Sequence, residues 1–135
     1  MTPLTAPDEL TRETLALIIP PDVAAVSTAR LFLSAVARGA GFEDDDIQDL
    51  RLAASEATTS AVRAHGSVAK DSAIEIRVSP SGEHIDVEIL SGPGFDETEN
   101  SLSLTVIHAL YSHVETAKHA DGRTALRFRA GKSPA

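Results

Sequence analysis

The sequence predicts an α+β domain of two layers, in which helices cover one face of a mixed, mostly antiparallel sheet. Two runs, Ser72–Ser79 and His84–Leu90, place a branched or bulky apolar residue at every second position, as strands with one buried face do. Between residues 43 and 66, apolar residues recur every three or four positions instead, which indicates a helix. The predicted order of all elements is β-α-α-β-β-α-β-β.

The first strand and the first helix are predicted from their boundaries. Leu15–Ile19 alternates bulky residues and stops at a Pro-Pro pair, so it is expected to be a short strand. Asp22 is expected to cap the helix Val23–Ala40, because a short acidic side chain accepts hydrogen bonds from the first turn. Gly39 and Gly41 are expected to end this helix.

The second helix is predicted to start in an acidic cluster and to end near Gly66. The cluster Glu43–Asp46 is favoured at a helix N-terminus by the helix dipole. The apolar positions that define its buried stripe are Ile47, Leu50, Ala54, Ala57 and Ala61.

The C-terminal half is predicted to hold two hairpins with a helix between them. The turn Pro80–Gly82 joins the two alternating runs as the first hairpin. A third helix is expected at about Ser101–Ser112. The second hairpin is expected to pair Val114–His119 with Thr124–Arg129 around the turn Ala120–Gly122.

Composition predicts one domain that works in the cytoplasm. Residues 12–130 are expected to form the domain, whereas residues 1–11 and 131–135 are expected to be flexible ends. The chain has no cysteine, the N-terminus lacks the features of a signal peptide, and no apolar run is long enough for a membrane helix. The net charge of −8 disfavours direct binding of nucleic acid and suits a partner with basic faces, although solubility alone also explains it.

A turn that follows the second alternating run is the strongest functional signal. Ser91–Asp96 reads Ser-Gly-Pro-Gly-Phe-Asp, and glycines there let the backbone pass close to a ligand. Such turns usually only connect elements, so the motif alone decides nothing. Three other stretches accompany it, namely Glu56-Ala-Thr-Thr-Ser60-Ala-Val62, Ser101-Leu-Ser103-Leu-Thr-Val-Ile107 and Gly122-Arg-Thr124.

In this order and spacing, the four stretches resemble the ATP-binding (Bergerat) fold of gyrase, Hsp90, histidine kinases and MutL. Within that superfamily the chain is similar to the small anti-sigma factors of the RsbW and SpoIIAB type. It is nearest to actinobacterial RsbW-like proteins such as UsfX, whose nucleotide motifs are similarly eroded. The resemblance covers roughly residues 12 to 130 and implies that fold.

The resemblance assigns most of the candidate nucleotide site, and the chain departs from it at four positions. The family has a metal-binding Asn where this chain has Ser60, and an Asp that binds the adenine amino group where it has Leu90. The family also wraps the phosphates with two glycines where this chain has Ser101 and Ser103. Leucine accepts no hydrogen bond, and each lost bond to a ligand costs roughly tenfold to a hundredfold in affinity.

Other family positions are retained. Gly92 and Gly94 match the glycines of the turn, and Thr124 matches a threonine of the last block. Glu56 matches the general base that activates a water or a serine hydroxyl. Without a magnesium ligand at Ser60, the resemblance gives that base no properly held γ-phosphate. Glu56 is therefore a catalytic candidate that could equally be a solvated helix carboxylate.

No other catalytic or metal site is predicted. Ala130–Ser133 is similar to the end of a P-loop, but it lacks the first glycine and a following helix. His108 and His113 are five residues apart and do not share a helix face, so no metal ligand is assigned. A nucleophile elbow is also missing, so no catalytic triad is predicted.

Two classes of function follow. The first is a binding regulator that sequesters an alternative sigma factor and is released by a STAS-type antagonist; the second is a serine kinase that phosphorylates this antagonist with Mg-ATP. A pseudo-ATPase domain with an unrelated partner is a third reading. The eroded motifs favour the first, with no cofactor, and the resemblance implies a homodimer. Arg30, on the first helix, is the candidate contact for the sigma factor.

Overall fold

The computed structural model describes residues 14–66, 73–92 and 100–133. In chain order, the elements are β1 (Leu15–Ile19), the 3-10 turn η1 (Val23–Ala25), α2 (Val26–Gly39), α3 (Asp44–Gly66), β2 (Ile74–Pro80), β3 (His84–Ser91), α4 (Ser101–Leu110), β4 (Val114–Lys118) and β5 (Thr124–Gly131). The predicted fold class and the predicted order of elements are confirmed.

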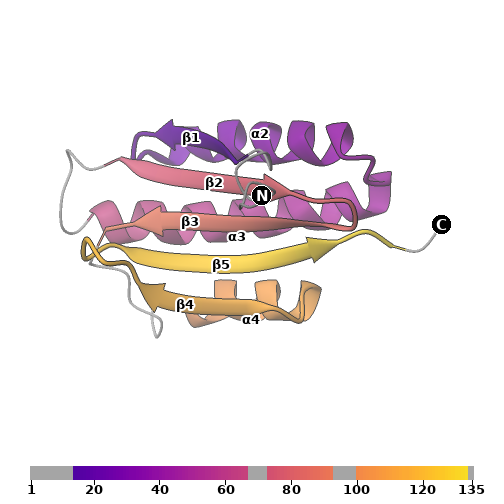
Figure 1. Ribbon diagram of the computed structural model, residues 1–135. Helices are drawn as coiled ribbons and strands as arrows, with labels where there is room; N and C mark the ends of the chain where they lie inside the picture. Colours follow the sequence, from indigo (N-terminus) through magenta and orange to yellow (C-terminus); the bar gives the residue numbers. More distant parts are fainter. Residues whose placement is uncertain (1–13, 67–72, 93–99, 134–135) are drawn as a thin grey trace, which may run out of the picture.

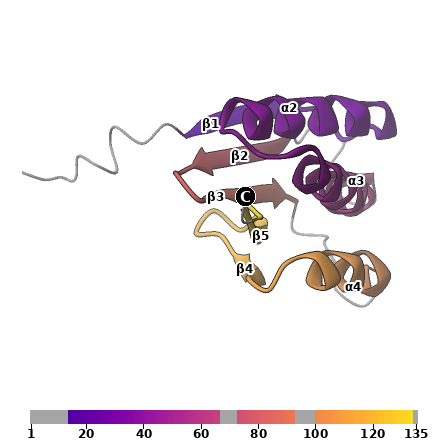
Figure 2. The same ribbon diagram turned by 90° about the vertical axis from the view of Figure 1, so that its right-hand side faces the viewer.

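The strands form one sheet in the order β1-β2-β3-β5-β4, and each pairing of neighbours is antiparallel. Figure 1 looks at the open face of this sheet, and Figure 2, turned by 90°, shows α2, α3 and α4 together on the other face. Registers continue without a bulge across the sheet, so residues opposite one another point to the same side. One face is therefore covered by helices and the other is open.

The first helix begins with a tighter turn than the sequence predicts. Asp22 is the expected cap, and its Oδ1 accepts a hydrogen bond of 2.9 Å from the Ala24 amide. The amide of Val26 then bonds to the carbonyl of Val23, three residues back, so the first turn is a 3-10 turn and the α-helix starts at Val26.

The backbone at the end of α2 explains why a glycine is needed at position 41. Gly41 adopts a positive φ of 86°, where a side chain would be strained. The amide of Gly41 donates to the carbonyl of Arg38 (3.1 Å), and the amide of Phe42 donates to that of Ala37 (3.0 Å). This pair of bonds is a Schellman motif, which satisfies carbonyls at the helix end and turns the chain towards α3.

The helix α4 is shorter than predicted. The sequence predicts a helix to Ser112, but α4 ends at Leu110, and Tyr111 is extended. The ring of Tyr111 stacks on Phe128 with the ring centroids 5.2 Å apart. This contact with β5 outweighs the helical pattern of the sequence at residues 111 and 112. A stacked pair of rings contributes free energy beyond that gained from the apolar area that it buries.

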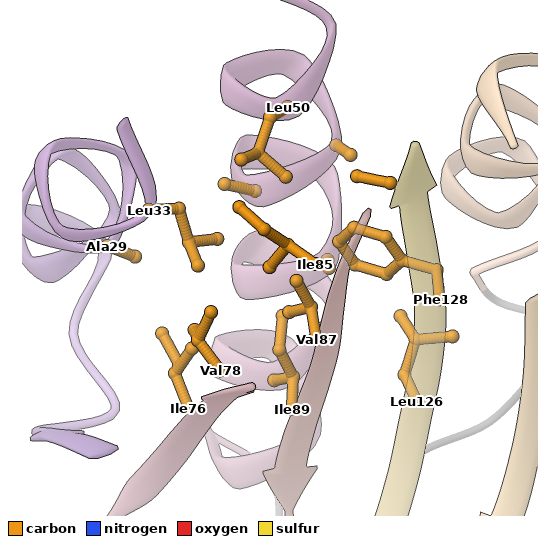
Figure 3. Close-up of a cluster of buried hydrophobic side chains, with 14 of the residues drawn as sticks. Ala29, Leu33, Leu50, Ile76, Val78, Ile85, Val87, Ile89, Leu126 and Phe128 are labelled. Carbon is orange, nitrogen blue, oxygen red and sulfur yellow. The ribbon is translucent and has the colours of Figure 1, made fainter. Parts of the chain in front are cut away.

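The core lies between the sheet and the helices, and Figure 3 shows its large side chains. They are Ile76, Val78, Ile85, Val87, Ile89, Leu126 and Phe128 from the sheet, Leu33 from α2 and Leu50 from α3. The stripe of α3 that faces them is otherwise small, with Ala53, Ala54, Ala57 and Ala61 each at most 2% exposed. Small side chains let α3 lie close to the sheet, which brings its flanking polar residues near the strand ends.

The open face of the sheet is charged and internally paired. One row runs across four strands, from Arg77 through Glu88 and Arg127 to Glu115, with alternating sign. The Nε of Arg127 lies 2.8 Å from Glu88, and its Nη1 lies 3.2 Å from Glu115. These cross-strand pairs keep the uncovered face polar and hold the register of β3, β5 and β4.

The hydrogen bonds of Glu75 allow the contribution of this charged face to stability to be tested. Hydrogen bonds from Arg77 and then Arg123 hold the pKa of Glu75 below its ordinary value. Because the folded-state pKa is lowered, the carboxylate stabilises the fold at neutral pH, and this contribution is lost as the pH falls through the folded-state pKa. Glu75→Gln should lower the free energy of unfolding by about 1 kcal/mol at pH 7, and the difference should narrow below about pH 4.

Urea unfolding at pH 7 and below about pH 4 measures the difference in free energy of unfolding between the variant and the unmodified protein. Glu83→Gln is the control, because Glu83 is exposed. Equal losses in the two variants, or a difference for Glu75→Gln that persists in acid, would contradict the assignment.

Candidate functional site

Polar side chains line one side of α3. Glu56, Ser60 and Arg63 are spaced by four and three residues, so they lie along one stripe of the helix. Ser60 is 2% exposed, and Glu56 is half-buried. The alanine stripe that faces the sheet lies beside them, and it fixes the direction in which they point.

Two hydrogen bonds join α4 to this stripe. The hydroxyl of Ser103 donates to Oε1 of Glu56 over 2.9 Å, and Nη1 of Arg63 donates to Oδ1 of Asn100 over 2.8 Å. Asn100, directly before α4, and Ser103 are both buried. The structure therefore brings together two predicted site residues that are 47 positions apart, Glu56 and Ser103.

The ends of two strands provide the floor of the same region. Ser91, at the end of β3, lies opposite Thr124, at the start of β5. Both continue the alternation of the helix-facing row, and they are 3% and 7% exposed. The hydroxyls of Thr124 and of Ser60 are buried and find no hydrogen-bond partner among the described residues.

Leu90 lies on the other face of the sheet. It is opposite Glu75 in β2 and Ala125 in β5. Glu75 bonds Arg77 and Arg123 on the open face, so the side chain of Leu90 points away from α3 and α4. Matching the family's Asp by its distance from the glycine turn selects Leu90, but the alternation of β3 makes Ser91 the residue that faces the helices.

The remaining predicted positions are less closely grouped. Gly92 follows β3 and is buried, whereas Gly94 lies outside the described residues. Ser101 is exposed at the start of α4. Arg30 is not part of this region, because its Nη1 donates to Ser55 (3.1 Å) and so joins α2 to α3.

The other motifs of the sequence acquire structural roles. Ala130 ends the helix-facing row of β5, and Ser133 donates to Asp46 through both its amide (2.9 Å) and its hydroxyl (2.6 Å). Among the residues that the structure describes, no group of three or more His, Asp or Glu side chains is placed to hold a metal ion.

The region is suited to hydrogen bonding. Buried hydroxyls without a partner, as at Ser60 and Thr124, cost free energy unless a water or a ligand satisfies them. Magnesium prefers carboxylate oxygens together with phosphate, and Ser60 offers a hydroxyl instead. The Glu56 carboxylate already accepts a bond from Ser103. These residues therefore fit a polar group better than a magnesium complex.

Sequence reasoning missed three residues of this region. Ser91 follows from the period of the strand, since Ile85, Val87 and Ile89 occupy the buried face and residue 91 continues it. The contact between Arg63 and Asn100 has no signal in the sequence, because the two residues are 37 positions apart and neither belongs to a motif.

A comparison with known protein families identifies the family of this chain. Residues 19–130 match the family profile of the histidine kinase-like ATPase domain. No curated protein matches the sequence. None of the helices within the described ranges combines the length and the apolar character that crossing a membrane requires.

Two solved structures have a similar fold. The structure of the RsbU and RsbW domains of Rv1364c from Mycobacterium tuberculosis has a TM-score of 0.73 and 22% identity, over 91% of this chain and 33% of the other. This chain thus spans about a third of that one. The SiaB–SiaC complex from Pseudomonas aeruginosa gives a TM-score of 0.55 and 13% identity, over 96% of this chain and 98% of the other. The predicted fold is confirmed.

The bond between Ser103 and Glu56 is expected to hold α4 against α3. Ser103→Ala removes a hydrogen bond to a carboxylate, which contributes about 1.4 kcal/mol and hence roughly tenfold in local opening. Amide hydrogen exchange along α4 should quicken by that factor. Ser101→Ala is the matched control, because Ser101 lies two residues earlier and its side chain is exposed. Equal exchange in the two variants would show that this contact does not position α4.

Proposed function

The chain belongs to the family of histidine kinase-like ATPase domains, and from this premise we propose that it is an anti-sigma regulatory factor. It binds and sequesters an alternative sigma factor in the cytoplasm and is released by a STAS-type antagonist. Binding, not phosphoryl transfer, is its activity.

The contact between Ser103 and Glu56 carries this proposal. In the family, the acidic residue at this position acts as a base near a bound nucleotide. Here its carboxylate accepts a hydrogen bond of 2.9 Å from α4. The neighbouring Ser60 supplies no carboxylate or amide for magnesium, so among the residues that the structure describes we assign no magnesium ligand that would hold a γ-phosphate in line for transfer. A domain with this site keeps the fold and its outer surfaces, which are what a binding regulator needs.

The named neighbours support a protein partner. The neighbour with 22% identity contains an RsbW domain, and the other is one half of a two-protein complex, SiaB–SiaC. Both likenesses are of fold, so the sigma factor and the antagonist are part of the proposal.

The outer side of α2 is a suitable surface for the sigma factor. Leu31 is 67% exposed, and it lines a groove of about 500 Å³ together with Arg38 and Arg51. Arginine is enriched among the residues that contribute most to binding at protein interfaces, and two arginines flank the exposed Leu31 here. Arg30 lies beside Leu31 in the sequence, and its bond to Ser55 joins α2 to α3.

A small-molecule role is the second candidate. The unpartnered hydroxyls of Ser60 and Thr124 favour a bound polar group, and Ser91 lies beside Thr124. A nucleotide base held without magnesium is compatible with these donors and acceptors. This role and the partner-binding role use different surfaces, so each can be tested alone.

Capture from the native cytoplasm tests the partner. A sigma factor should be recovered, and Leu31→Asp should weaken its binding by about 2 kcal/mol, roughly thirtyfold. Arg30→Glu should weaken it by about 1–3 kcal/mol. Leu102→Asp is the matched control, because Leu102 is 76% exposed on α4.

Melting temperatures are measured in parallel, because Arg30 also bonds Ser55. Recovery of an unrelated partner would overturn the proposed partner. Equal loss of affinity for Leu31→Asp and Leu102→Asp would overturn the proposed surface.

Calorimetry with Mg-ATP tests the nucleotide site. The protein should not bind Mg-ATP with a dissociation constant in the micromolar range. The reason is that Ser60 and Ser91 offer only hydroxyls where tight binding would use an amide and a carboxylate. The double variant Ser60→Asn with Ser91→Asp should bind at least about tenfold more tightly than Ser60→Asn alone. Leu90→Asp should instead destabilise the fold, because it buries a carboxylate opposite Glu75. Micromolar binding by the unmodified protein would refute the degenerate site.

A further inference from the structure

An apolar groove lies between β1 and the C-terminal half of α2. It has a volume of about 620 Å³, and its walls include Leu15 of β1, Phe32, Ala35 and Val36 of α2, and the turn Pro80–Gly82. Leu15 is 39% exposed, and Phe32 and Val36 are only half-buried at the margin of the core. Apolar side chains in this state leave free energy to be gained by an apolar segment that covers them.

A lysine adds a positive charge to this groove. Lys132 is part of the lining, and its Nζ atom lies 5.9 Å from the centre of the Phe42 ring. The amide of Lys132 donates to the carbonyl of Glu83 over 2.9 Å, which fixes the backbone from which the side chain extends. The ion pairs formed among the described residues do not include Lys132. The groove therefore offers an apolar floor and a cation to which no described residue supplies a carboxylate.

The chain enters β1 at the rim of this groove. Leu15, the first residue of β1, belongs to the lining, and the hydroxyls of Thr14 and Ser79 are 3.0 Å apart. This contact holds the start of the described chain against the end of β2. The residues directly before it, 8–13, read Asp-Glu-Leu-Thr-Arg-Glu, with Leu10 as the one large apolar side chain and three carboxylates against one arginine.

Leu10 can reach every part of the groove. It precedes Leu15 by five residues, which span at most about 17 Å when extended. The stretch of α2 and its cap that lines the groove, Phe32–Ala40, is about 12 Å long at a rise of about 1.5 Å per residue. So short a tether also holds the segment at a roughly millimolar effective concentration, so that a contact too weak for a separate molecule is populated within one chain.

We propose that residues 8–13 fold back over this groove in their own copy of the chain, with Leu10 against Phe32 and the acidic pair Asp8-Glu9 beside Lys132. The chemistry of the two sides is complementary. An apolar side chain meets an apolar floor, and carboxylates meet a cation that lacks one. The segment thereby covers the space between β1 and α2.

A second copy of the chain and a separate partner are the competing occupants of the groove. Either would have to displace a segment that is tethered at its rim, which costs the free energy of the tethered contact. The surface proposed for the sigma factor, around Leu31 and Arg51, lies on the α3 side of α2. The inference therefore does not depend on the proposed function.

A spin label next to Leu10 tests the docking. The chain has no cysteine, so Thr11→Cys in the full chain takes a single label. Docking predicts broadened amide signals for residues 35–40. Leu10→Asp in the labelled protein should lower the docked population about tenfold or more, because a carboxylate replaces a buried leucine, and most of this broadening should disappear. Leu4→Asp, the same substitution outside residues 8–13, is the matched control and should retain it.

Charge reversal tests the contact with Lys132. Lys132→Glu should lower the docked population about threefold, the scale of a solvated ion pair, whereas Lys118→Glu on β4, at the opposite edge of the sheet, should not change it. A mixture of spin-labelled protein with isotope-labelled protein that carries no spin label should show no broadening. Broadening in this mixture, equal broadening in the two leucine variants, or equal effects of the two lysine variants would each overturn the inference.

Discussion

The unbroken antiparallel register of the sheet is the constraint on which the rest of the structure depends. With one face covered by helices, a shift of one residue in β2, β3 or β5 would expose its apolar side chains and bury its charges. The register therefore fixes three features at once. It aligns Arg77, Glu88 and Arg127 on the open face, it places Ser91 beside Thr124 under the helices, and it leaves β1 as an uncharged edge.

In the proposed function, this fold binds a partner and does not transfer a phosphoryl group. Alanines on α3 bring that helix close to the sheet, and this spacing is independent of what binds beside it. Serines occupy positions where the family has an amide and glycines, and one of them, Ser103, bonds Glu56. A hydroxyl on the chain thus satisfies the carboxylate that a ligand would otherwise engage.

Most of the fold follows from local patterns in the sequence. Alternation of apolar residues predicts β2 and β3. Asp22 and Gly41 mark the two ends of the segment that holds η1 and α2, and the apolar stripe of residues 47–61 predicts α3. The errors are at positions decided by distant contacts. Stacking of Tyr111 on Phe128 ends α4 early, which no local pattern indicates. Counting back from the glycine turn selects Leu90 as the match to the family's adenine-binding Asp, whereas the alternation of β3 shows that Ser91 faces the helices. The hydrogen bond between Arg63 and Asn100 has no signal in the sequence.

Mapping the captured partner on the protein by amide chemical-shift perturbation is the most direct test of the central claim, that the chain acts by binding through its outer helical surface. With no nucleotide present, the account predicts perturbed amides along α2 and the adjoining face of α3, around Leu31 and Arg51. Amides at Ser60, Ser91 and Thr124 should keep their shifts. A partner that perturbs only these three positions, or that perturbs the protein only after Mg-ATP is added, would contradict the account.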